Sequence, residues 1–547
     1  MDKKTKLSAK PGKIVSKPIW PWVALVLAIT AVSFAPMLGN GFTNWDDDYY
    51  VTLNNLLRGP DWKGLFTQPV GNNYHPLTIL SLALNYQISG LSPESYFLVN
   101  YLLHLLNTFL VFRFVLQISG KNLWVAVLTS LIFGIHPMHV ESVAWISERK
   151  DVLYSFFFLL SLIAYWKFLL NNRKRDYWLS LLWFTLSLLS KPAAIVLPLI
   201  LFLLDYWKER KITRSLFIEK IPFVVLSAVL AILTLQVQAP AISGLEVFPL
   251  WTKPLFACYG VMIYAVRFII PYPLSAFHPY PAMSDLGWAV MLSPLFILAL
   301  VILLWVFRKN KTFVFSTAFF VINLLLVLQV ISIGGAIVAE RYTYVPYIGA
   351  AFLLSTAVVS TAEKYRYKAL PVWILFVAVT AVFGSMTWQR TKVWKDSGAL
   401  WNNTLSHYPD APVPRGNRAS FLYRTAIEPE HAAESDSLFR QAIDDCTVSL
   451  KGYPGLFRSH ETRGLIYLRQ NRNFEALSDA DALIRLSPAG SADQALGFSM
   501  RGTANMRLNE PGKAIADFTS CLAITTEDDN ALINRGAVYY SSYRQYD

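Results

Sequence analysis

A series of long apolar segments between residues 19 and 387 constrains the fold of this chain more than any other feature. The first segment, residues 19–38, has the roughly 20 residues that a helix needs to cross a bilayer. Inside a bilayer the backbone polar groups must be hydrogen-bonded within the protein, so such segments must fold as helices. We therefore predict an all-α chain that begins as a polytopic membrane protein, with residues 19–387 as its membrane domain.

Further candidate spans follow the first at short intervals: 97–116, 123–135, 152–170, 178–189, 193–204, 221–235, 288–307, 313–331, 344–359 and 370–386. Residues 178–189 and 193–204 are each short for a span and are predicted to form a hairpin with Lys191 at its tip. Residues 255–270 are also apolar but contain Arg267, and we expect them to enter the membrane without crossing it. The chain is then predicted to have about 11 transmembrane helices.

The basic residues predict the orientation of these helices. Clusters of Lys and Arg lie between the apolar segments, at residues 1–17, around 121, and at 173–175, 208–214, 308–311 and 364–368. Cytoplasmic loops are enriched in Lys and Arg, and all these clusters share one side if residues 1–18 are a cytoplasmic N-terminus and the C-terminal part lies outside. The net charge of +13 therefore indicates membrane orientation, and no nucleic-acid partner is expected.

The sequence after Trp388 becomes polar and contains a repeated pattern. An Arg-Gly pair recurs at intervals of 38 and 34 residues, at Arg463-Gly464, Arg501-Gly502 and Arg535-Gly536. Ala476, Ala514 and Phe518 then fall at the small and aromatic positions of tetratricopeptide repeats. We predict a linker at 388–414 and a tetratricopeptide-repeat α-solenoid at 415–547, whose last unit, ending at Asp547, is either a capping helix or truncated.

The first external connection contains three successive carboxylates, Asp46, Asp47 and Asp48. Their mutual repulsion beside a membrane favours a raised pKa for one of them, as a general base requires. A solvated acidic loop or a helix N-cap is the alternative that the residues alone leave open.

A second polar stretch follows the third span, where His136 and His139 precede Glu141. Its spacing lacks the His-Glu-x-x-His form of a zinc helix, so no metal is predicted. Arg149 and Lys150 lie shortly after it and suit a phosphate, since Arg pairs in a bidentate manner and Lys acts as a point charge. Three cysteines, Cys258, Cys446 and Cys521, exclude a disulfide framework.

Several of these motifs together resemble a known family. They are Trp45-Asp46-Asp47-Asp48, Tyr74-His75-Pro76-Leu77-Thr78, His136-Pro137-Met138-His139-Val140-Glu141, Glu148-Arg149-Lys150-Asp151, Ser190-Lys191-Pro192 and Ala339-Glu340-Arg341-Tyr342. In order and in content they are similar to those of the transmembrane and tetratricopeptide-repeat-containing O-mannosyltransferases, and we expect a bacterial relative of them. The resemblance implies a GT-C type membrane fold and inverting transfer of a sugar, mannose or a similar one, from a polyprenyl-phosphate donor to Ser/Thr hydroxyls of exported proteins.

The resemblance also implies roles for individual residues. Asp46 or Asp47 would be the catalytic base, and the donor phosphate would be bound by Arg149, Lys191 and Arg341. Supporting roles fall to Asp48, His75, His139, Glu141 and Glu340. No metal and no cofactor are expected beyond the polyprenyl-phosphate sugar, and the partners are that donor, membrane lipids and a protein or peptide acceptor held by the repeats. The expected location is the bacterial inner membrane, with the repeats in the periplasm.

Other functions remain open at this stage. The same membrane domain is compatible with transfer to a glycan, a lipid or a cell-wall polymer. A non-enzymatic membrane-anchored scaffold would tolerate replacement of Asp46, Asp47, Lys191 and Arg341. A transporter is disfavoured because the polar residues cluster at one face and no inverted repeat is evident.

Overall fold

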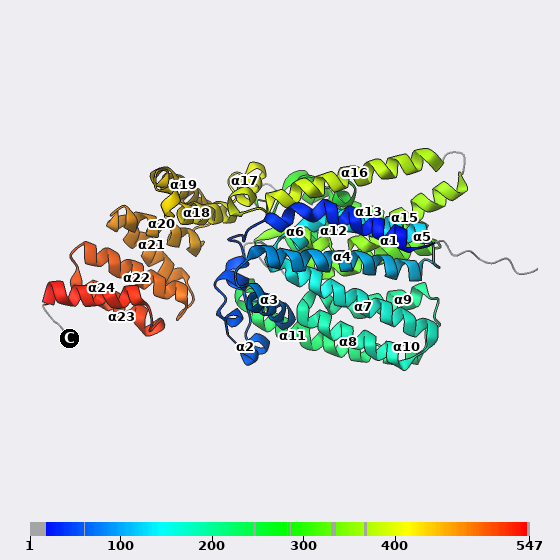
Figure 1. The fold of residues 1–547 in the computed structure, drawn as a ribbon, viewed down its shortest axis with the longest axis horizontal. Coiled ribbons are helices and arrows are strands. Elements are labelled where there is room, and N and C mark those ends of the chain that lie inside the picture. Colours follow the sequence, from blue (N-terminus) through cyan, green and yellow to red (C-terminus); the bar gives the residue numbers. More distant parts are fainter. Residues whose placement is uncertain are drawn as a thin grey trace, which may run out of the picture.

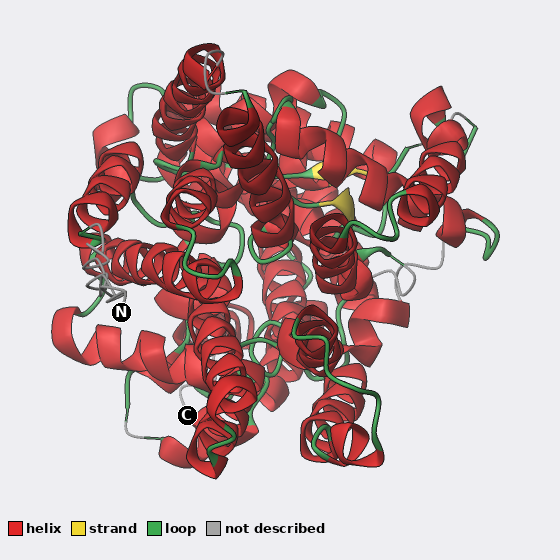
Figure 2. Ribbon diagram, turned by 90° about the vertical axis from the view of Figure 1, so that its right-hand side faces the viewer, coloured by secondary structure: helices red, strands yellow, loops and turns green. Residues whose placement is uncertain are grey.

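The computed structural model describes residues 18–59, 61–243, 248–281, 283–284, 286–329, 335–365 and 369–543. Within these ranges the only sheet has two short antiparallel strands, β1 (His278–Pro279) and β2 (Ala336–Val338), and the other regular elements are helical. Figure 2 shows the two strands among helices. The predicted all-α class is confirmed. The expected basic N-terminus falls, except for Pro18, outside the described residues.

The membrane body contains the long helices of the N-terminal two thirds of the chain, which run side by side in Figure 1. They are α1 (Trp20–Phe34), α4 (Pro93–Ile118), α5 (Leu123–Ile135), α7 (Arg149–Asn171), α8 (Lys174–Ser190), α9 (Leu197–Trp207), α11 (Ile221–Ser243), α12 (Thr252–Ile269), α13 (Gly287–Val306), α14 (Lys311–Leu324), α15 (Tyr347–Lys364) and α16 (Ala369–Val393). Short helices connect them: α2 (Trp62–Thr67), α3 (Pro76–Ser89), α6 (Val140–Ala144) and α10 (Arg214–Ile218).

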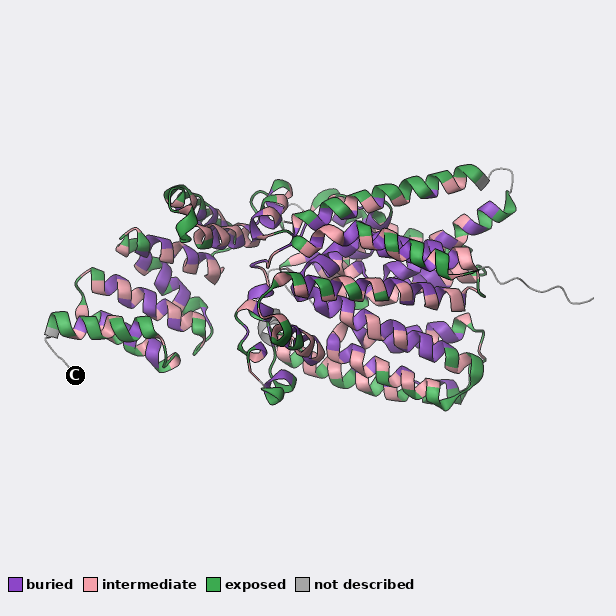
Figure 3. Cartoon of the chain, in the orientation of Figure 1, coloured by how far each residue is buried: buried purple, intermediate pink, exposed green. Residues whose placement is uncertain are grey.

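Apolar side chains cover the outside of this body as well as its core. Helix α13, for example, exposes Leu295, Val301 and Trp305 to the surroundings, and Figure 3 shows α16 exposed along much of its length. A helix that is apolar on all sides is stable when lipid surrounds it. Together with the length of the helices, this makes the chain a multi-pass membrane protein.

When helices are counted as spans by their length and apolarity, the structure has fewer spans than the sequence predicts. In the described ranges six helical segments are long and apolar enough to cross a membrane, and a seventh is formed if α5 and the segment Pro137–Ala144, bent by 54°, are one span. Two shorter apolar segments, Pro192–Trp207 and Lys311–Val327, add to these. The total of about eleven also counts α8 and α15, of 17 and 18 residues, and stays a prediction.

The C-terminal part forms stacked helix hairpins, as the repeat pattern predicts. Its helices are α18 (Pro412–Ala426), α19 (Ser435–Gly452), α20 (Phe457–Arg469), α21 (Asn473–Leu486), α22 (Ala492–Arg507), α23 (Pro511–Ile524) and α24 (Asp529–Val538), each packed on the next. The predicted small positions Ala476 and Ala514 are fully buried, and the ring of Phe518 lies against Gly502.

The segment expected to be a linker, residues 388–414, is largely helical, and its role as a linker stays a prediction. Helix α16 continues to Val393, and α17 (Ser397–His407) follows it. Trp394 and Trp401 are fully buried, and both contact the ring of Trp45. Burial of these large aromatic side chains fixes the segment on the membrane body.

Candidate functional site

The acidic loop, residues 44–50, lies where the membrane body meets the repeats. It follows a short helix at Ala35–Gly39 and leads into a single turn of π-helix, Asp48–Thr52. The backbone amide and hydroxyl of Thr43 donate hydrogen bonds to Asp47 Oδ2, and those of Ser147 donate to Oδ1. Burial nevertheless raises the pKa of Asp47 to about 6, because it outweighs these hydrogen bonds. One carboxylate oxygen of Asp47 therefore attaches the loop to Ser147 of the body, and the other closes a turn onto Thr43.

Asp48 is also held by its neighbours. Its carboxylate accepts a hydrogen bond from Thr52 and pairs with Arg424 of α18, whose Nη2 lies 2.8 Å from Oδ2. This contact attaches the loop to the repeats.

Asp46 is only partly buried, whereas Asp47 and Asp48 are buried. Its carboxylate makes no hydrogen bond within 3.5 Å and no ion pair within 4.0 Å with any residue that the structure describes. Burial raises its pKa above 3.8, and the positive charges of Lys150 and Arg341 offset part of that effect. Asp46 is thus the aspartate of the three that is available to a bound molecule.

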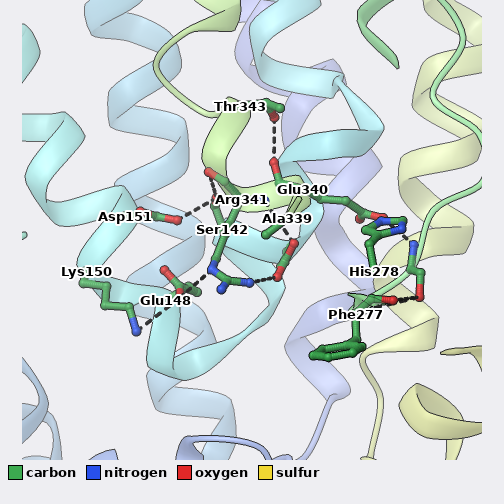
Figure 4. Close-up of polar contacts among 12 residues, drawn as sticks. Ser142, Glu148, Lys150, Asp151, Phe277, His278, Ala339, Glu340, Arg341 and Thr343 are labelled. Carbon is green, nitrogen blue, oxygen red and sulfur yellow. Dashed lines mark hydrogen bonds and ion pairs between the residues drawn. The ribbon is translucent and has the colours of Figure 1, made fainter. Parts of the chain in front are cut away.

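Three cations converge next to Asp46, around the carboxylate of Glu148. Lys150 Nζ lies 3.1 Å from this carboxylate, Lys191 Nζ 3.2 Å and Arg341 Nε 3.3 Å. Lys150 is the second residue of α7, Lys191 follows α8, and Arg341 belongs to a 3-10 turn at Glu340–Thr343. Figure 4 shows Lys150 and Arg341 directed toward Glu148. Three separate connections therefore place positive charge at one point.

Further carboxylates hold these cations in place. Glu141 accepts hydrogen bonds from the backbone amide and the guanidinium of Arg341. Asp151 pairs with Lys191 and also accepts a hydrogen bond from Ser142. The predicted supporting role of Glu141 agrees with this geometry.

Arg149, expected to bind the donor phosphate, does not join this cluster. Its guanidinium is fully buried between helices and donates to Ser81, Asn85, Asn100 and the carbonyl of Tyr96. The acceptors of these hydrogen bonds are all neutral groups within the body. Lys150, the next residue, reaches the cluster instead, because successive residues of a helix point about 100° apart.

The side chain of Glu340 has other partners than that of its neighbour Arg341. It is fully buried, accepts a hydrogen bond from the amide of Ser275 and pairs with Arg390 at 3.4 Å. Glu340 thus fixes the loop that precedes β1, and Glu141 is the residue that orients Arg341.

The histidines are buried and point to packing more than to metal binding. His75 stacks on Tyr50, with ring centroids 5.2 Å apart, and its Nε2 has no partner among the described residues. His139 bonds the carbonyl of Phe133, and His136 bonds that of Phe268. No group of three His, Cys, Asp or Glu residues suited to a metal occurs in the part of the chain that the structure describes.

Sequence reasoning missed two features of the site. The first is Glu148, the centre of the cation cluster. The sequence gives it no role of its own, because its neighbours Arg149 and Lys150 carry the positive charge that suits a phosphate. The second is a pair of tryptophans beside the cluster. The ring centroids of Trp45 and Trp145 lie 4.6 Å apart in a stacked arrangement, and the guanidinium carbon of Arg341 lies 5.6 Å from the Trp145 ring centroid. The contact joins residues far apart in sequence, so no local pattern marks it.

Comparison with known proteins identifies relatives of the chain. The family described as "Dolichyl-phosphate-mannose-protein mannosyltransferase" matches residues 73–237. The Protein O-mannosyl-transferase F38B6.6 of Caenorhabditis elegans is 25% identical over 412 residues, which cover 70% of this chain and 57% of that protein. The human Protein O-mannosyl-transferase TMTC3 is 22% identical over 549 residues, covering 85% of this chain and 59% of the relative.

Shorter stretches are more similar. The Protein O-mannosyl-transferase TMTC2 of Mus musculus is 46% identical over 107 residues, which are 19% of this chain and 13% of the relative. Among solved structures, ArnT from Cupriavidus metallidurans bound to undecaprenyl phosphate aligns over 94% of this chain and 88% of that one, with 11% identity and a TM-score of 0.34. The chain spans less than two thirds of the length of the curated relatives that it matches. On these sequence matches, the chain is a relative of the protein O-mannosyl-transferases.

Proposed function

We propose that this chain is an integral-membrane glycosyltransferase that moves a sugar, mannose or a similar one, from a polyprenyl-phosphate donor to a Ser/Thr hydroxyl of a protein. The names of the matching family and of the relatives favour a polyprenyl-phosphate donor and a protein acceptor. The observation that carries the proposal is Asp46, whose carboxylate has no partner among the described residues, beside three converging cations.

The proposed reaction is a single displacement at the anomeric carbon. The acceptor hydroxyl attacks that carbon while Asp46 takes its proton, and the bond between the carbon and the phosphate oxygen breaks with its electron pair leaving on the phosphate. Attack opposite the leaving group inverts the configuration. A general base of this kind contributes roughly 10²–10⁴-fold to the rate.

Lys150, Lys191 and Arg341 stabilise the charge that develops on the leaving phosphate. Fixed cations act strongly in a site from which water is excluded, and Lys150 and Arg341 lie over the rings of Tyr50 and Trp145. Their pairing with Glu148, Glu141 and Asp151 holds them in position before the donor binds. No divalent metal is part of this proposal.

The repeats present the acceptor in this proposal. Stacked helix hairpins form extended surfaces that suit a polypeptide, and α18 directly contacts the acidic loop. We place the site and the repeats on the periplasmic face of the bacterial inner membrane, opposite the cytoplasmic basic clusters.

A transfer assay in proteoliposomes tests the proposed function. Purified protein is incubated with several polyprenyl-phosphate sugars and, in parallel, with a Ser/Thr-rich peptide, an oligosaccharide or a lipid acceptor. We expect transfer to the peptide from at least one donor, with inverted configuration in the product. Transfer only to the glycan or lipid would move the acceptor to that class, and absence of transfer to every acceptor would favour a scaffold.

A further inference from the structure

We propose that the repeat helices form part of the catalytic centre, with Arg424 and Arg458 as positioning residues for the loop that carries Asp46. The inference rests on the proposed function for the role of Asp46. It assigns the repeats a second task besides presenting the acceptor, namely holding the catalytic loop in its working position.

The first contact is made by α18. Arg424 directs Nη1 and Nη2 at the two oxygens of Asp48, at 3.3 and 2.8 Å. A bidentate pair of this kind fixes orientation as well as distance, because both partners are planar. Asp48 is two positions from Asp46, so this pair fixes the backbone on the C-terminal side of the proposed base.

The second contact comes from a different hairpin, through α20. Arg458 donates to the carbonyl of Asn44 at 3.1 Å and to the hydroxyl of Tyr49 at 2.7 Å, and its guanidinium lies 5.4 Å from the Tyr49 ring centroid. One side chain of the repeats therefore bridges both ends of the acidic loop.

Residues of α17 and α18 complete this support. The side chain of Asn44 donates to the carbonyl of Asn417 at 2.8 Å and accepts from the indole of Trp401 at 2.7 Å. The amide of Asn44 donates to Ser397 at 2.8 Å. The loop is thus tied to α17, α18 and α20 on one side.

On the other side the loop is tied to the membrane body by Asp47, through Thr43 and Ser147. Its residues contact both parts, and among the described residues the carboxylate of Asp46, alone of the three aspartates, is held by neither. A rigid loop with one unpaired carboxylate is suited to a base that must meet the acceptor hydroxyl at a fixed distance.

The test compares Arg424→Ala, Arg458→Ala and the conservative Arg424→Lys with Arg472→Ala in the full-length protein. Arg472 is a matched control, because it also makes a half-exposed ion pair on the repeats, with Glu475 at 3.0 Å, and contacts no residue of the acidic loop among the described residues. The transfer assay gives kcat and the KM for the polyprenyl-phosphate sugar, and hydrogen–deuterium exchange reports the mobility of residues 44–52.

We expect Arg424→Ala and Arg458→Ala to lower kcat at least 10-fold with an unchanged donor KM, since misplacement by about 1 Å can cost 100-fold. Exchange of residues 44–52 should become faster in both. Arg424→Lys should recover part of kcat, and Arg472→Ala should match the wild type.

Wild-type kcat in both alanine variants would overturn the inference. So would a loss of kcat accompanied by faster exchange throughout the repeats, because that result describes general unfolding. If the wild type transfers no sugar, the proposed function fails, whereas faster exchange confined to residues 44–52 still supports positioning of the loop by the repeats.

Discussion

Three aspartates that adjoin in sequence have three different environments. Asp47 is bonded to the membrane body, Asp48 is paired with Arg424 of the repeats, and Asp46 faces the cation cluster without a partner of its own among the described residues. The sequence identifies the cluster as a place for acid–base chemistry, but which member is free depends on Thr43, Ser147 and Arg424. Two of these residues lie far away in the chain, so local reasoning leaves the choice between Asp46 and Asp47 open.

The pH dependence of transfer follows from the environment of Asp46. A base acts in its ionised form, so kcat/KM should fall as the pH is lowered through the pKa of Asp46, which burial raises above 3.8. The charged groups that face it are Lys150, Glu148, Arg341 and Arg458.

Removing the positive charge of Lys150 should raise this pKa further. The acid limb of the pH–rate profile is therefore expected at higher pH in Lys150→Met than in the wild type, whatever the rate itself. A limb at or below pH 3.8, or one that Lys150→Met shifts to lower pH, would contradict the assignment.

Lys191 and Arg149 predict different phenotypes when each is replaced by Met. Lys191→Met should reduce kcat by roughly 10²–10³, as loss of one charge-stabilising donor does in other enzymes. Arg149→Met should lower the unfolding temperature, because Asn85, Asn100 and the Tyr96 carbonyl lose their donor, at about 1–3 kcal/mol for each buried group.

Differential scanning fluorimetry in detergent and the transfer assay together measure both effects. Equal stability of the two variants with equal loss of rate would place Arg149 in the donor site after all.

Secondary-structure elements follow from the sequence where a periodic or apolar pattern is strong. Lys191 lies between α8 and α9 as expected, but α8 packs mainly on α7 and α9 mainly on α14 and α7, so the predicted hairpin does not form as a packed pair. The small and aromatic repeat positions pack as predicted. The packing of residues 388–414 was not predicted, because their polar composition masks Trp394 and Trp401, which are fully buried. That segment is held by contacts with distant parts of the chain, which its local sequence does not reveal.

Glycines at equivalent repeat positions predict a graded effect of substitution by Ala. A Cβ at Gly502 would lie 2.9 Å from the Phe518 ring, one at Gly464 would meet the flexible end of Met500, and one at Gly536 meets nothing within 4 Å. Gly502→Ala should cost about 1–3 kcal/mol of stability through overpacking, and Gly464→Ala less.

Gly536→Ala is the control and should be neutral or stabilising, since Ala is favoured over Gly in a helix by up to about 1 kcal/mol. Thermal unfolding of the repeats checks the series. The same loss of stability in all three variants would argue against a close contact specific to Gly502.

At the scale of the whole molecule, the acidic loop and the repeats lie at one end of the membrane body, and helices α9 and α10 reach the other end (Figure 1). The basic turn at residues 208–214 lies between these two helices. This basic turn and the proposed site therefore lie at opposite ends of the body, as the positive-inside rule requires if transfer occurs outside the cytoplasm.

Cysteine labelling of intact cells tests this orientation. In a Cys258→Ser background, where Cys446 and Cys521 are buried, a cysteine at Glu434 of the repeats should react with a membrane-impermeant maleimide. A cysteine at Lys309, in the exposed turn between α13 and α14, should react only after permeabilisation. The reverse pattern would place the repeats in the cytoplasm.

The central claim is that Asp46 is the base of a glycosyl transfer, and kcat of Asp46→Asn tests it most directly. With the donor and acceptor that the wild type uses, we predict a fall of roughly 10²–10⁴-fold, with an unchanged unfolding temperature and unchanged donor binding. Asp47→Asn is the comparison, and it should lower stability, because one amide cannot accept the hydrogen bonds from both Thr43 and Ser147. Wild-type kcat in Asp46→Asn would contradict the account.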